Sequence, residues 1–220
     1  MRGSDVAELL FWPALIAYGE AAVAYVGVLR RPELAARLAI WGVRIGWLAQ
    51  TGLLAVEAWQ ADGFPWADWA GALNLFVWFA VGAYLVYGSS PRYRLLGVAV
   101  MPGAAVLFAL AGLGGASEQS GSDLFTAVHV GLVVAGFAGF ALAAALAGLY
   151  LWLGRRLKRS PAGVLRLGPP SLVTLDGVVA RVSAVSLASF TVGIALGFVR
   201  GHDIDPVSYT HLTLPTILLV

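Results

Sequence analysis

His129 is the residue of this chain whose type and position most clearly suggest chemistry. It lies at the head of an apolar run, residues 128–153, which ends in the cationic stretch RRLKR at 155–159. A neutral imidazole is a common protein ligand of iron, and ionisable groups at a membrane edge are costly and therefore candidate functional groups. The spacing predicts His129 near one membrane face, with a cationic anchor at the other. The residue alone is equally compatible with an interfacial hydrogen bond.

Two charged residues lie inside predicted apolar segments. Glu20 falls near the middle of the first segment, and Arg44 falls about two turns into the second from its basic end. In one interpretation, Arg44 extends toward the nearer membrane surface while Glu20 is protonated or hydrogen-bonded inside the bundle. In the other, Glu20 and Arg44 form an ion pair that fixes the packing of the first two helices.

Tryptophans gather near the predicted outer face, where Trp12, Trp59, Trp66 and Trp69 lie at segment ends or in the loop between them. An interfacial aromatic belt is one interpretation. The other is a platform for a flat hydrophobic cofactor, with Trp66 and Trp69 as its candidates. The pattern alone does not separate these two.

Several kinds of chemistry have no support in the sequence. The chain contains no cysteine, which excludes disulfides, thiol relays and thiolate metal sites. No nucleophile–base pair is evident, and the glycine-rich GLGGAS at 112–117 lacks the lysine of a phosphate-binding loop. An independent catalytic activity is therefore not indicated. The net charge of +2 gives no reason to expect nucleic acid as a partner.

The elements that must position these residues are membrane spans. Of the 220 residues, 60% are hydrophobic and 12% are charged, whereas a soluble domain has about 25% charged residues. The apolar blocks are roughly twenty residues long, enough to cross a hydrocarbon core of about 30 Å. We therefore predict an all-α fold, a polytopic transmembrane helical bundle. Its six predicted spans are 7–29, 38–57, 68–87, 95–113, 124–153 and 178–199.

The charges of the intervening loops predict an orientation. Eleven of the fourteen Lys and Arg residues fall on one side, in alternate loops, while most Asp and Glu residues fall on the other. By the positive-inside rule the basic side is cytoplasmic. Both ends of this chain, together with His129, are then expected on the outer side of the membrane.

Two stretches resemble motifs of a known family. The first is GWLAQT at 46–51, followed by DGFP at 62–65. The second begins at His129 and continues with YL at 150–151, LK at 157–158, PSL at 170–172, LD at 175–176, and TVGI at 191–194 with Gly197. In order and spacing they resemble the cytochrome c assembly proteins that handle haem (the CcsA/CcmC superfamily), and especially its HemX-type branch.

This resemblance implies that His129 is an axial ligand of haem iron. It also implies a tryptophan-rich outer segment after the last span matched here, followed by two further spans with a second ligand histidine in the outer loop between them, and this sequence contains none of these. The tail from about Val207, VSYTHLTLPT, resembles sequencing-adapter read-through. We therefore expect a membrane domain at 1–205, truncated at its C-terminus, a non-native tail at 206–220, and an incomplete haem site. His202 is a further candidate ligand, because it follows the last span on the face expected for His129.

The functional expectation is a multi-pass protein of the cell inner (plasma) membrane. It would bind or present haem at the extracytoplasmic face during cytochrome c biogenesis, with other cytochrome c assembly membrane proteins as partners. The alternative is a HemX-type regulatory or scaffold protein that affects glutamyl-tRNA reductase levels in tetrapyrrole synthesis. In that case, the basic loop at 155–166 would be a cytoplasmic contact surface.

Overall fold

The computed structural model describes residues 3–27, 32–60, 66, 68–114, 124–159 and 169–202. Within these ranges the regular elements are all helices, and no strand occurs. The long helices are α1 (Gly3–Gly27), α2 (Pro32–Gln60), α3 (Trp69–Tyr87), α4 (Arg94–Ala111), α5 (Leu124–Arg159) and α7 (Leu172–His202), and a short 3-10 helix, η1 (Pro91–Tyr93), precedes α4. The predicted all-α bundle is confirmed.

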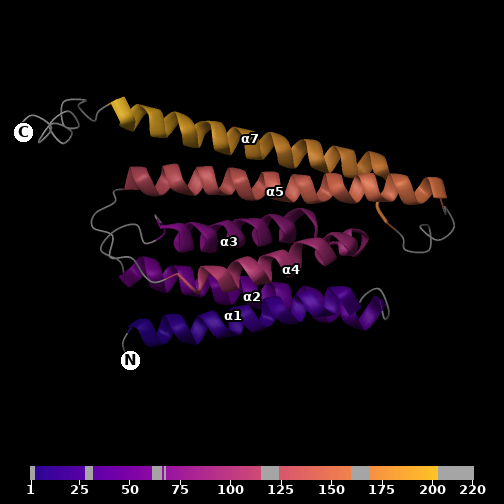
Figure 1. Cartoon of the computed structure of the whole chain (residues 1–220), viewed down its shortest axis with the longest axis horizontal. Helices are drawn as coiled ribbons and strands as arrows, with labels where there is room; N and C mark the ends of the chain where they lie inside the picture. Colours follow the sequence, from indigo (N-terminus) through magenta and orange to yellow (C-terminus); the bar gives the residue numbers. More distant parts are fainter. Residues whose placement is uncertain are drawn as a thin grey trace, which may run out of the picture.

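Five of these helices are long and apolar enough to cross a membrane, judged by length and composition. The exception is α4, whose apolar stretch Leu95–Ala111 is about 25 Å long, near the lower limit for a span. It nevertheless returns the chain from the end of the bundle where α3 stops to the end where α5 begins (Figure 1). The chain is thus a multi-pass membrane protein.

Three helices extend well beyond the predicted spans. α2 begins at Pro32, whereas the sequence predicts a start at 38. α5 continues through the basic residues to Arg159, and α7 begins at Leu172, where the prediction had placed its start at 178. The early start of α7 has a local cause, because the Ser171 hydroxyl accepts a hydrogen bond from the backbone N–H of Thr174 at 3.1 Å. This is the N-cap interaction that begins many helices. The PSL motif therefore marks the start of α7.

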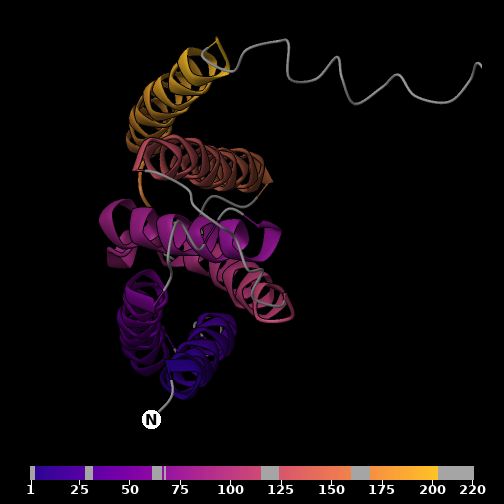
Figure 2. The same ribbon diagram turned by 90° about the vertical axis from the view of Figure 1, so that its left-hand side faces the viewer.

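The helices form a layered stack (Figure 2). α1 and α2 pack together at one edge, α3 and α4 lie in the middle, α5 follows, and α7 forms the opposite edge. α7 packs mainly on α5, and only 17% of its apolar span is buried. α7, at the edge of the stack, therefore has most of its surface exposed to lipid or to another partner.

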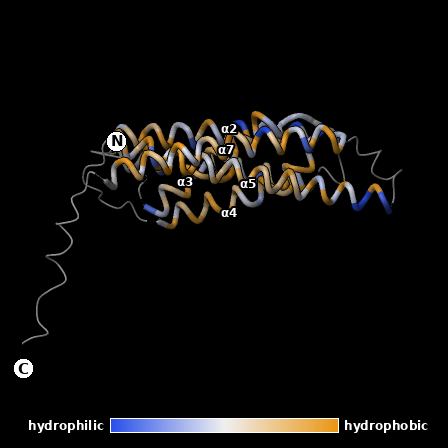
Figure 3. The backbone as a smooth tube through the Cα atoms, turned by 90° about the horizontal axis from the view of Figure 1, so that it is seen from above, coloured by the Kyte–Doolittle hydropathy of each residue, from blue (hydrophilic) through white to orange (hydrophobic). Residues whose placement is uncertain are grey.

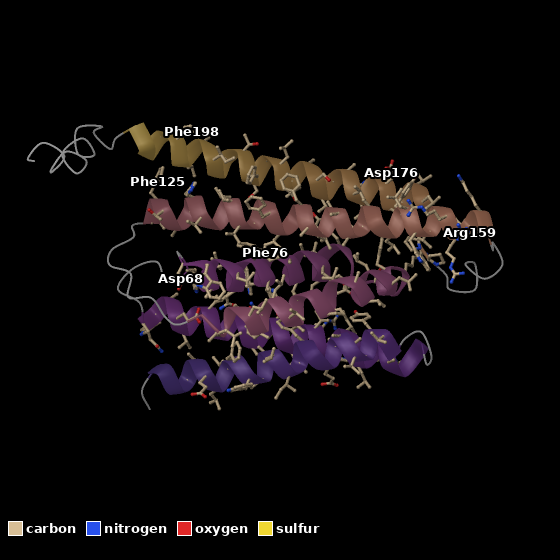
Figure 4. The ribbon with its side chains drawn as sticks, in the orientation of Figure 1. Asp68, Phe76, Phe125, Arg159, Asp176 and Phe198 are labelled. Carbon is tan, nitrogen blue, oxygen red and sulfur yellow. The ribbon has the colours of Figure 1, made fainter. Side chains whose placement is uncertain are left out.

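The two ends of the bundle can be told apart by the residues that lie there. Asp68, Phe125 and Phe198 lie at one end, and Arg159 and Asp176 lie at the other (Figure 4). Hydrophobic residues predominate along the helices, with shorter hydrophilic stretches among them, and the far end of α5 is hydrophilic (Figure 3). We call the end with Asp68, Phe125 and Phe198 the outer end, after the predicted orientation, and the end with Arg159 the basic end. The tail predicted to be non-native, at 206–220, lies outside the described residues.

A buried polar network joins α1, α2 and α3. The Tyr18 hydroxyl donates to Gln50 Oε1 at 2.6 Å, and Gln50 Nε2 donates to Asn74 Oδ1 at 2.7 Å and to the Asn74 carbonyl at 3.0 Å. Gln50 is fully buried, so these bonds replace the water that its amide would otherwise need. The network fixes the depth at which α2 packs against its two neighbours.

Two tryptophans extend this contact between α2 and α3. The rings of Trp47 and Trp78 stack with their centroids 5.3 Å apart. Trp47 Nε1 donates to the Trp78 carbonyl at 3.0 Å, and Trp78 Nε1 donates to the Thr51 hydroxyl at 2.8 Å. The tryptophan, glutamine and threonine of the GWLAQT motif thus all serve to dock α2 onto the bundle.

Candidate functional site

His129 lies at the outer end of α5, as predicted, and its ring is turned toward α7. Its Nδ1 atom is 2.7 Å from the carbonyl oxygen of Gly193. A carbonyl oxygen can only accept, so in the neutral imidazole the proton lies on Nδ1 and the lone pair lies on Nε2. The side chain is half-buried. His129 therefore combines a fixed imidazole with a second nitrogen that remains available as a donor to a metal.

The interface between α5 and α7 is built on glycines. A Cβ atom at Gly136 would lie 2.8 Å from Phe190 Cβ, and one at Gly193 would lie 2.8 Å from a Val133 methyl group. Small residues at such spacings let helix backbones approach closely. Gly193 and Gly197, which the sequence offered only as part of a family motif, both lie against α5: a Cβ at Gly193 would meet Leu132 and Val133, and one at Gly197 would meet the His129 ring.

The two candidate tryptophans occupy different surroundings. Trp66 is half-buried, packs against Leu54 and Leu75, and donates from Nε1 to Glu57 Oε2 at 2.7 Å. Trp69 is 63% exposed at the start of α3, where the Asp68 side chain caps the helix by accepting from the Gly71 N–H. These positions suit Trp66 for holding the outer ends of the helices together, and leave Trp69 as the exposed ring.

Trp69 also lines an apolar groove between α3 and α5, with a volume of about 630 Å³. Its walls are Trp69, Ala72, Leu73 and Phe76 of α3, and Val134, Phe137, Phe140 and Ala141 of α5. His129 is not among these residues, because its ring is turned toward α7, whereas the groove lies on the side of α5 that faces α3. The structure thus brings Trp69 and His129 to the same end of the bundle but not into one pocket. No sequence motif indicates this groove.

The structure does not pair Glu20 with Arg44. Both side chains are exposed, on α1 and α2 respectively, and no ion pair joins them in the described structure. The Arg44 guanidinium instead lies over the ring of Trp41, 5.4 Å from its centroid, which agrees with an arginine that extends along the helix surface. The interpretation that Glu20 is buried inside the bundle is also wrong, since α1 turns this residue outward.

His202 is the last residue of α7, so its backbone lies at the same end of the bundle as the start of α5. Its side chain is outside the described part of the structure. His211 lies in the tail that is also outside it. No group of three or more metal-ligating side chains is present among the described residues, which leaves His129 as the candidate ligand whose surroundings are defined.

These features define a class of protein: a polytopic helical membrane protein with an oriented imidazole at the outer end of a tightly packed helix pair. The family model described as "Cytochrome C assembly protein" matches residues 66–203, which is more than half of the chain. The chain belongs to this family, and membership supports a role in cytochrome c biogenesis. Searches of curated proteins and of solved structures returned no match.

The family match covers the second of the two motif stretches, which begins at His129, but not the first. It includes Trp66, Trp69, His129 and the two glycines of α7 that face the α5 helix. It leaves out α1 and α2, and therefore the GWLAQT motif, whose side chains dock α2 onto the bundle.

Proposed function

We propose that this chain binds haem at the extracytoplasmic face of the inner (plasma) membrane and presents it to other cytochrome c assembly proteins, with His129 as an axial ligand. The observation that carries this proposal is the hydrogen bond from His129 Nδ1 to the Gly193 carbonyl. Histidines that bind metals through one ring nitrogen usually donate the other N–H to a carbonyl, carboxylate or water. His129 has this arrangement.

Two features of the residues around His129 support haem binding. The donor atom would be a neutral imidazole Nε2, the ligand type found in many haem proteins. No described residue forms a hydrogen bond with this atom. The exposed apolar side chains Val128 and Phe198 are sequence neighbours of His129 and Gly197, and they would offer apolar surface to the porphyrin. When bound, haem supplies the iron chemistry, and the chain supplies binding and orientation.

The exposed surface of α7 supports a haem site that a second ligand or a partner protein would complete. α7 is packed mainly on α5 and is largely exposed, and the His129 ring is hydrogen-bonded to this outermost helix. His202 remains a candidate second ligand, because its backbone lies at the same end of the bundle. The α3–α5 groove, with Trp69 at its outer end, offers an additional apolar surface there.

A haem titration tests this proposal. We expect the purified protein in detergent to give a saturable Soret band with haemin, and His129→Ala to lose it. His202→Ala, measured beside it, removes the candidate second ligand and should weaken the band less. A wild-type protein without a Soret band, or a His129→Ala spectrum identical to that of the wild type, would contradict the proposal.

A regulatory role is the second candidate, and the basic end of α5 favours it. Arg155, Arg156, Lys158 and Arg159 are all exposed. α5 has 36 residues and is about 54 Å long, which exceeds a hydrocarbon core of about 30 Å. Its basic end would therefore extend into the cytoplasm, where a HemX-type protein that affects glutamyl-tRNA reductase levels would need a contact surface.

Charge-neutral substitutions of these four residues test the regulatory candidate. If the surface acts as a contact, the level of glutamyl-tRNA reductase should change while haem binding stays as in the wild type. Unchanged levels, with membrane insertion intact, would mean that the charges serve only to orient the chain in the membrane.

A further inference from the structure

We infer that Gly193 and Gly197 of α7 are positioning residues for His129: the Gly193 carbonyl selects the tautomer, and the missing side chain of Gly197 makes room for the ring. As a statement about the ligand-free protein, this inference stands on geometry alone. Its consequence for haem affinity rests on the proposed function.

The tautomer follows from the hydrogen bond between the two helices. The Gly193 carbonyl oxygen has two acceptor lone pairs, so it can accept both from its own helix and from His129 Nδ1. The imidazole is therefore presented with its N–H toward α7 and its lone pair on Nε2. Without this bond the neutral ring would be free to carry its proton on Nε2, where it would block a metal.

The space for the ring comes from Gly197, one turn further along α7. A Cβ atom at this position would lie 2.6 Å from His129 Cε1 and 3.1 Å from Nδ1. Real Cβ atoms do not approach other atoms so closely, so a side chain here would push the ring away. The ring is the movable partner of this contact, because the three atoms nearest to a Cβ at Gly197 all belong to the His129 side chain. The expected result is a displaced His129 in an otherwise folded bundle.

A second hydrogen bond holds α5 and α7 together close to His129 and Gly193. The Ser189 hydroxyl donates to the Leu132 carbonyl at 2.9 Å, about one helical turn deeper than His129 and Gly193. The Gly193 carbonyl is therefore held in place by packing and by a bond that do not involve the imidazole. This makes α7 a fixed support, and it makes His129 the group that is oriented.

Nuclear magnetic resonance of the histidine rings tests the tautomer without haem. In the His202→Gln, His211→Gln background, His129 is the only histidine, and selective ¹⁵N labelling reports its ring nitrogens alone. We expect a protonated Nδ1 and an unprotonated Nε2 at a pH where the ring is neutral. A protonated Nε2 in the neutral ring would overturn the inference, whether or not the protein binds haem.

Two glycine substitutions test the consequence for binding. Gly197→Ala should shift the ring signals of His129 and lower haem affinity by roughly 10- to 100-fold, as is typical when the support of a metal ligand is lost. Gly177→Ala is the matched control on the same helix, because a Cβ there meets nothing within 4 Å. If Gly197→Ala matches Gly177→Ala in both ring signals and haem affinity, the inference is wrong. If the wild type binds no haem, the proposed function fails, and the ring signals alone decide the inference.

Discussion

At the scale of single residues, the position of one proton decides whether His129 can donate a lone pair to a metal. A membrane-edge histidine can serve as an interfacial hydrogen-bond donor or as a ligand, and its sequence position fits both roles. The bond from Nδ1 to the Gly193 carbonyl leaves Nε2 with its lone pair. Trp66, in contrast, has its indole N–H bonded to Glu57 and its ring packed against Leu54 and Leu75, which indicates a structural role.

Gln50 provides a prediction at the same scale. Gln50→Leu should lower the free energy of unfolding by about 1–3 kcal/mol, because it removes the partner of the Tyr18 hydroxyl and of the Asn74 carbonyl groups in a buried site. The measurement is an unfolding titration in detergent. Thr191→Val, a similar loss of polarity at an exposed position of α7, should change the free energy much less. Equal effects of the two substitutions would argue against a stabilising network.

At the scale of elements, the cap of α7 explains where this helix begins. Ser171→Ala should destabilise the first turn of α7 by about 1 kcal/mol, since the Thr174 N–H loses its acceptor. Hydrogen exchange of the Thr174 amide is the measurement, and it should become faster. Ser171→Asp is the control, because aspartate is also a good N-cap and should preserve slow exchange. Fast exchange in both variants would show that the side chain of residue 171 is not what protects this amide.

The elements also show what the sequence could predict. Apolar blocks were sufficient to predict the order of the helices and the place of His129 near the start of the fifth one, because such blocks reflect burial in a bilayer. The contact of His129 with Gly193 joins residues 64 positions apart, and only the packing of α5 on α7 brings them together. Glu20 was misplaced for a related reason, since its depth in a span does not tell which face of the helix it occupies.

At the scale of the whole molecule, the orientation in the membrane can be tested with single cysteines. The chain has none of its own, so Trp59→Cys and Lys158→Cys each introduce one reactive thiol. Residue 59 is on the last turn of α2, toward the outer end, and residue 158 is at the basic end of α5. We expect a membrane-impermeant maleimide to label Trp59→Cys in intact cells, and Lys158→Cys only after permeabilisation. The reverse pattern would invert the orientation and place His129 at the cytoplasmic face.

The most direct test of the central claim, that His129 ligates haem, is to remove the imidazole and then return it as a free molecule. His129→Gly leaves a space beside the Gly193 carbonyl that added imidazole can fill with the same donor nitrogen. We expect the Soret band of the wild type to be lost in His129→Gly and to return when imidazole is added, with no such response in the wild type. A His129→Gly protein that shows the wild-type spectrum without imidazole would contradict the claim.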